Sequence, residues 1–127
     1  MDADRIRKRL AELNFDREQY RVSTGAAMVL YGIRLETADI DLGCTSALAD
    51  ALEKEYPVTV LADGTRKFVL GGDVETFENW CAGETEELDG IPVVSPEGLI
   101  TVKTALGREK DRRDIALIRE YIANRAE

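Results

Sequence analysis

Residues 24–44 read TGAAMVLYGIRLETADIDLGC, and two aspartates, Asp39 and Asp41, stand two positions apart near the end of this stretch. On a strand, this spacing points both carboxylates to one side and places Ile40 and Leu42 on the other side. The pattern fits a strand with one solvated face. It also fits two carboxylates that share a cation, because a cation removes the repulsion between like charges. Mg²⁺ binds carboxylate oxygens and leaves coordination positions for phosphate.

The residues before the aspartates predict a strand over 20–23, a turn and then a helix over 24–32. The N-terminus of a helix presents free backbone N–H groups that suit a phosphate. Gly25 has no side chain to block a phosphate, and the hydroxyl of Ser23 or Thr24 can add a hydrogen bond. Such a turn also serves ordinary packing, so the functional indication is the turn combined with the paired aspartates.

The rest of the chain predicts further helices and strands in alternation. Helices are expected at 2–13, 45–56, 95–107 and 109–126, strands at 38–43, 58–61, 66–70, 71–77 and 91–94, and a polar loop at 81–90. Capping residues, Pro and Gly mark the ends of these elements. This order predicts an α/β (α+β) fold, a small mixed sheet flanked by helices, in a single domain over residues 1–127.

Composition narrows the function. With 127 residues, 44% hydrophobic and 33% charged, the chain is predicted to be globular. Its net charge of −8 argues against general nucleic-acid binding. The absence of histidine excludes Ser-His and Cys-His catalysis. Cys44 and Cys81 are expected to be two thiols in a reducing cytoplasm, with one disulfide as the alternative. Neither a signal peptide nor a membrane span is expected.

The stretch over residues 24–42 resembles the signature of the DNA polymerase beta-like nucleotidyltransferase superfamily, a small-residue turn followed by a D-x-D on a strand. The sequence pattern GxAxxLYGxRxxTxDIDL in this stretch resembles that of small bacterial nucleotidyltransferase-like proteins related to the abortive-infection toxin group. The later stretch GREKDRRDIALI, residues 107–118, resembles the R-x-KD-x-x-D-I element of such proteins. The resemblance implies the minimal nucleotidyltransferase fold.

The resemblance also implies a division of roles. Asp39 and Asp41 would bind Mg²⁺ or Mn²⁺, and Gly25 with Thr24 would hold the β- and γ-phosphates of an NTP. A third carboxylate would come from GGDVETF, residues 71–77, where we prefer Glu75 because it lies within the strand. Asp73 is the alternative, and both also suit solvated strand positions. Thr24 departs from the family, which has glycine there, and its methyl group narrows the approach of a triphosphate.

Four basic residues are candidates for neutralising the triphosphate. Lys103, Arg108 and Lys110 lie in or beside the last two helices, where a solvated helix face is the alternative. Arg34 lies between the turn and the aspartates, where its side chain could orient a carboxylate or contact a phosphate. Two carboxylates are expected to cap or pair locally: Asp111 and Asp114. Three aromatic residues are expected either to pack in the core or to stack on a nucleotide base: Tyr31, Phe77 and Trp80.

The implied activity is Mg²⁺-dependent transfer of a nucleoside monophosphate from an NTP to a hydroxyl, with release of pyrophosphate. The acceptor stays open between RNA, a protein and a small molecule. A chain of this length leaves little room for an acceptor-binding domain, so a homodimer or a partner protein is expected to supply that surface. The competing hypothesis is a catalytically inactive nucleotide-binding or toxin–antitoxin interaction module of the same fold.

Overall fold

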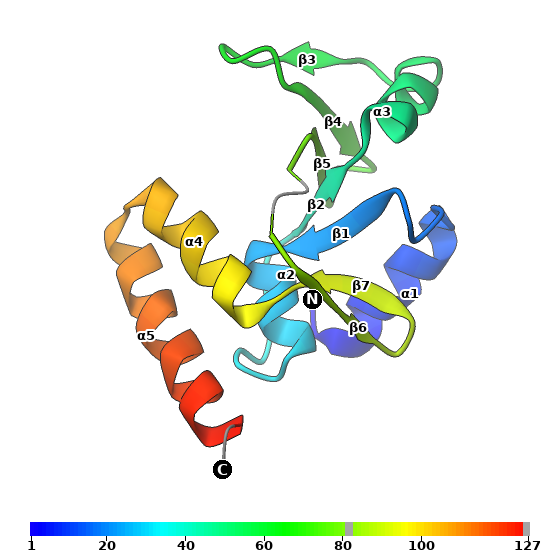
Figure 1. Ribbon diagram of the computed structural model, residues 1–127. Helices are drawn as coiled ribbons and strands as arrows, with labels where there is room; N and C mark the ends of the chain where they lie inside the picture. Colours follow the sequence, from blue (N-terminus) through cyan, green and yellow to red (C-terminus); the bar gives the residue numbers. More distant parts are fainter. Residues whose placement is uncertain (81–82, 126–127) are drawn as a thin grey trace.

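The computed structural model describes residues 1–80 and 83–125, in which one seven-stranded sheet is surrounded by helices (Figure 1). The helices are α1 (Ala3–Leu13), α2 (Thr24–Leu30), α3 (Ser46–Glu53), α4 (Pro96–Leu106) and α5 (Glu109–Arg125). The strands are β1 (Tyr20–Ser23), β2 (Ile40–Cys44), β3 (Thr59–Val60), β4 (Arg66–Leu70), β5 (Val74–Glu78), β6 (Thr85–Leu88) and β7 (Ile91–Val94). The predicted fold class is confirmed.

The sheet is mixed, with the strand order β3-β4-β5-β2-β1-β7-β6. β2 runs parallel to β5 and β1 runs parallel to β7, whereas the other neighbouring pairs are antiparallel. β2 carries the D-x-D aspartate Asp41 and lies near the middle of the sheet, between β5 and β1. The register places Asp41 directly opposite Glu75 on β5 and opposite Ser23 on β1. The topology therefore unites two segments that lie far apart in the sequence.

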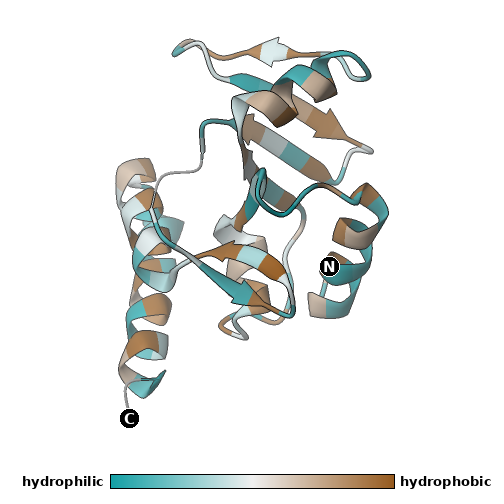
Figure 2. Cartoon of the chain, turned by 45° about the vertical axis from the view of Figure 1, so that its right-hand side comes forward, coloured by the Kyte–Doolittle hydropathy of each residue, from teal (hydrophilic) through white to brown (hydrophobic). Residues whose placement is uncertain are grey.

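The apolar residues of the central strands form the core with the helices. Ile40 and Leu42 are fully buried, as their alternation with the aspartates predicted. Ile6 and Leu10 on one side of α1 join the same core. In Figure 2, apolar segments lie along the strands and helices, whereas most loops are hydrophilic. Within the described ranges, no helix is both long enough and apolar enough to cross a membrane.

Three helices begin with a capping side chain at the start predicted from the sequence. The Asp2 carboxylate accepts a hydrogen bond from a backbone N–H in the first turn of α1, and the Thr45 hydroxyl does the same for α3. Ser95 caps α4, and Pro96 occupies the first helical position, where its missing N–H costs nothing. α2 is shorter than predicted and ends at Leu30.

The polar loop predicted over 81–90 is wrong for Thr85–Leu88, which forms the edge strand β6. Asp89 and Gly90 both have positive φ, 50° and 80°, which is the backbone of a tight type I′ hairpin turn. The glutamates of this segment suggested a loop, but an edge strand also tolerates exposed charged side chains. Residues 81–82 lie outside the described residues, and with them the predicted thiol of Cys81; Cys44 is buried.

Candidate active site

Three carboxylates meet where β2 and β5 run side by side. Asp39 immediately precedes β2, Asp41 is its second residue, and Glu75 is the second residue of β5. One oxygen from each of these residues lies within 4.8 Å of the others. We call Asp39, Asp41 and Glu75 the acidic triad. Parallel pairing of the two strands creates it, because equivalent positions on neighbouring strands point to the same face of the sheet.

The environment of Asp41 suits a bound cation. The Thr24 hydroxyl donates a hydrogen bond of 2.7 Å to Oδ2 of Asp41, whereas Oδ1 is buried and has no hydrogen-bond partner among the described residues. Burial raises the pKa of Asp41, the Thr24 hydrogen bond opposes this rise, and the charges of Asp39 and Glu75 add to it. A buried acceptor without a partner is costly. A hard divalent ion would supply that partner, so the donor set fits Mg²⁺ or Mn²⁺.

Thr24 adopts a backbone conformation that favours glycine. Its φ is +51°, in the left-handed region, which costs an L-residue roughly 1–2 kcal/mol. Glycine is also what the nucleotidyltransferase signature has at this position. The next residue, Gly25, lies in a confined space: a Cβ there would lie 2.6 Å from Oγ1 of Thr37 and 3.1 Å from Nη1 of Arg34. Both turn residues are therefore tightly constrained by their surroundings.

The acidic triad opens into a cleft of about 820 Å³. Thr24 and Gly25 line this cleft together with all four basic candidates: Arg34, Lys103, Arg108 and Lys110. The fold thus brings together residues from α2, the loop before β2, β5, α4 and α5. A cleft with carboxylates and basic groups side by side can bind a metal ion and an anionic ligand together.

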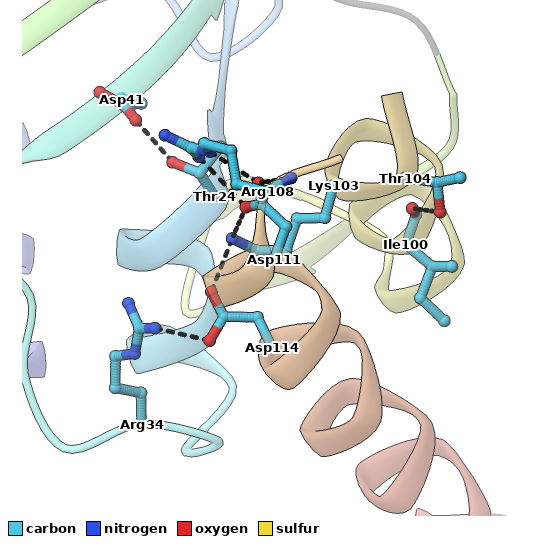
Figure 3. A network of polar contacts seen from close by, with 9 residues as sticks. All are labelled: Thr24, Arg34, Asp41, Ile100, Lys103, Thr104, Arg108, Asp111 and Asp114. Atoms are coloured by element: carbon cyan, nitrogen blue, oxygen red, sulfur yellow. Dashed lines mark hydrogen bonds and ion pairs between the residues drawn. The ribbon is translucent and has the colours of Figure 1, made fainter. Parts of the chain in front are cut away.

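Arg34, Lys103 and Arg108 are held by the two aspartates of α5 (Figure 3). Asp114 accepts hydrogen bonds from Arg34 at 2.7 Å and from Lys103 at 2.9 Å. Asp111 accepts from Arg108 at 2.6 Å and lies 3.6 Å from Lys103. The expected local pairing holds for Asp111, whereas Asp114 also pairs with Arg34, which is distant in the sequence. The Lys103 side chain is only 4% exposed and contacts both aspartates, so its charge is largely neutralised, whereas Arg34 and Arg108 remain partly exposed.

Three predicted candidates lie apart from this cleft. Ser23 is buried and lines a smaller, mostly apolar cavity nearby. Asp73, the alternative third carboxylate, is bound by Arg9 at 2.9 Å and is not part of the acidic triad. Tyr31 is buried, and its hydroxyl donates to the backbone carbonyl of Val94. Strand alternation alone could not separate Asp73 from Glu75, because it assigns residues two positions apart to the same face.

Two other aromatic residues do reach the cleft, and a lysine that was not predicted from the sequence lies beside them. Phe77 and Trp80 line the cleft and stack on each other, with ring centroids 3.8 Å apart. Lys67 on β4 places its Nζ 3.4 Å from Oε1 of Glu75 and 5.5 Å from the centre of the Phe77 ring. Only the register of the β4–β5 hairpin, which pairs Lys67 with Phe77, could have indicated that Lys67 lies near Glu75.

Comparisons with known proteins bear on the fold. A scan of protein-family models matches none of them, and a search of curated proteins finds no significantly similar sequence. The crystal structure of a candidate nucleotidyltransferase from Thermotoga maritima matches 98% of this chain and 96% of its own, with a TM-score of 0.63. The chain has a nucleotidyltransferase-like fold. The sequence identity is 18%, so the likeness speaks for the fold alone.

Proposed function

We propose that this protein is a Mg²⁺- or Mn²⁺-dependent nucleotidyltransferase that moves a nucleoside monophosphate from an NTP to a hydroxyl of an acceptor. The observation that carries the proposal is the acidic triad with the unpartnered Oδ1 of Asp41, at the edge of a cleft lined by basic residues. We expect residues 1–127 to act as one catalytic domain in the cytoplasm. The acceptor is RNA, a protein or a small molecule, presented by a homodimer or a partner protein.

Each group in the cleft has a role in this proposal. Asp39 and Asp41 would hold the ion that accompanies the NTP, and Glu75 would complete the site on the acceptor side. A divalent ion bound there would favour the deprotonated acceptor hydroxyl and stabilise negative charge on the leaving pyrophosphate. Arg34 and Arg108 keep exposed faces toward the cleft and would neutralise the triphosphate. The exposed side chain of Lys110 would add a further positive charge, and Gly25 with Thr24 would contact the phosphates.

One observation favours the competing function, an inactive nucleotide-binding or toxin–antitoxin interaction module. Thr24 stands where the resembled family has glycine, and its hydroxyl already occupies Oδ2 of Asp41. Such a module would bind nucleotide and transfer nothing. Metal binding by Asp41 is compatible with this hydrogen bond, because Oδ1 has no hydrogen-bond partner among the described residues and is available for an ion.

Label transfer from NTPs distinguishes the two functions. The protein is incubated with each NTP labelled at the α-phosphate, with Mg²⁺ or Mn²⁺ and a cell extract as the source of acceptor. We expect a labelled macromolecule or small product that disappears with a chelator and with the Asp41→Asn variant. Nuclease and protease digestion then assign the acceptor to RNA, protein or a small molecule. Nucleotide binding without any metal-dependent label transfer would favour the inactive module.

A further inference from the structure

Lys67 faces the acidic triad from the neighbouring strand. In the antiparallel β4–β5 pair, Lys67 lies opposite Phe77 and Val69 lies opposite Glu75. Lys67 and Glu75 are therefore diagonal neighbours on one face of the sheet, within reach of a long side chain. The Nζ of Lys67 lies 3.4 Å from Oε1 of Glu75, and both side chains are about one-third exposed or less. Glu75 lines the cleft, and neither side chain of the pair is locked in the core.

This contact is the one ion pair that the acidic triad makes within residues 1–80 and 83–125. The three carboxylates bring three negative charges together, and Lys67 offsets one of them. Lys103, the buried lysine of the cleft, is held instead by the aspartates of α5. Lys67 is thus the cation that pairs with Glu75.

An ammonium group and a divalent ion repel each other when both lie against the same carboxylate. Lys67 also has a second position to occupy, because its Nζ already lies 5.5 Å from the centre of the Phe77 ring, within the range of a cation–π interaction. A lysine side chain is a flexible point charge and can move between two such positions. Displacement of Lys67 from Glu75 would therefore leave the ammonium group beside the Phe77 ring, which it already contacts.

We propose that Lys67 is a positioning residue, a built-in counter-ion that holds Glu75 in the metal-free protein and must be displaced before Glu75 can bind a metal ion. The inference rests on the proposed metal site and deepens it. Without nucleotide, the first ion is then held by Asp39 and Asp41 alone. Glu75 becomes a ligand only when Lys67 leaves it. Lys67 thereby lowers the metal affinity of the acidic triad and delays completion of the site.

Mn²⁺ titration by calorimetry tests this proposal without nucleotide. The four proteins are the natural chain, Lys67→Met, Glu75→Gln and the double variant. We expect Lys67→Met to raise Mn²⁺ affinity at least fivefold. We expect Glu75→Gln to change the affinity less than twofold in the natural chain, but to lower it at least fivefold in the Lys67→Met background. The two substitutions are non-additive because removal of Lys67 frees Glu75 to act as a ligand.

Controls separate this role from a general effect of charge or folding. Lys8→Met makes the same charge change on an exposed residue of α1 that does not line the cleft, and should leave Mn²⁺ affinity unchanged. Lys67→Arg keeps the positive charge and should stay close to the natural chain. Lys67→Gln replaces Lys67→Met if that variant does not fold. Without metal, Lys67→Met should lower the melting temperature, and Glu75→Gln added to it should restore the loss.

Two results would overturn the inference: unchanged Mn²⁺ affinity in Lys67→Met, or the same loss from Glu75→Gln in both backgrounds. Asp41→Asn in the same titration keeps this failure distinct from that of the proposed function. If binding depends on Asp41 but not on Lys67, only the counter-ion role is wrong. If binding is independent of Asp41, the metal site itself is wrong, and this inference is overturned with it.

Discussion

The hydrogen bond from Thr24 to Asp41 provides a graded test of how the site is built. Valine has nearly the shape of threonine but no hydroxyl, so Thr24→Val removes the bond of 2.7 Å and keeps the left-handed strain at φ +51°. Hydrogen bonds to charged groups contribute about 1.5–3 kcal/mol. We expect Thr24→Val to destabilise the metal-free protein by about 2 kcal/mol at neutral pH, or roughly 8 °C in melting temperature.

Two further variants separate the hydrogen bond from the backbone strain. Thr24→Ser keeps the hydroxyl and should stay within ~0.5 kcal/mol of the natural chain, the range of substitutions that remove no specific interaction. Thr24→Gly loses the bond but recovers about 1–2 kcal/mol of left-handed strain, so its net loss should be about 1 kcal/mol or less. The expected order of stability is therefore Ser, then Gly, then Val.

The pH dependence of the Thr24→Val loss has a definite sign. The hydrogen bond favours the ionised Asp41 and so lowers a pKa that burial raises. Its contribution is present above that pKa and is lost as the pH falls and the carboxyl group is protonated. Thermal unfolding at pH 8 and pH 4 should show a larger Thr24→Val penalty at pH 8. Equal stability of Thr24→Val and the natural chain at pH 8, or a Ser variant as unstable as Val, would refute the reasoning.

Three further predictions concern other parts of the cleft and the sheet. Gly25→Val should lower NTP affinity at least tenfold, about 1.4 kcal/mol, with little change in circular dichroism; unchanged affinity in a folded variant would move the phosphate site elsewhere. Glu75→Gln should keep Mg-NTP affinity within a few-fold and abolish label transfer, whereas Asp73→Asn should be mild, and the reverse ranking would exchange their roles. Arg66 donates hydrogen bonds to the Glu78 carboxylate and lowers its pKa from 4.5 to about 2. This ion pair contributes stability above pH 4.5, and the contribution is lost as the pH falls toward 2. In thermal melts over that window, Glu78→Gln should show a flatter pH dependence than the natural chain, and parallel curves would contradict it.

The parts of the fold that follow from local patterns were predictable. Alternation around Asp39 and Asp41 identified the buried side of β2, and the hydroxyl and carboxylate caps located the helix starts. β6 was missed because charged residues such as Glu86 and Glu87 are typical of a loop, although Asp89–Gly90 is a hairpin signal. Local propensity failed there because pairing with β7 decides the conformation.

The candidate site was predictable only where one segment supplies the residues. Its place within the strand favoured Glu75 over Asp73, but the β2–β5 register and the contact of Asp73 with Arg9, which separate the two carboxylates in space, follow from no local pattern. Lys67 was missed for the same reason, since only the β4–β5 register brings it to Glu75. The only indication of the left-handed backbone of Thr24 in the sequence was that the resembled family has glycine at this position. Contacts between distant segments account for each of these gaps.

The central claim, a divalent metal site on the acidic triad, is tested most directly by Mn²⁺ binding to the Asp39→Asn, Asp41→Asn double variant. Calorimetry on the metal-free natural chain and on this variant gives the affinity, and circular dichroism confirms the fold. We predict that the variant loses measurable Mn²⁺ binding. Its melting temperature without metal should be equal to or higher than that of the natural chain, because mutual repulsion and the burial of an ionised Asp41 are relieved. Mn²⁺ binding as tight as that of the natural chain would contradict the account.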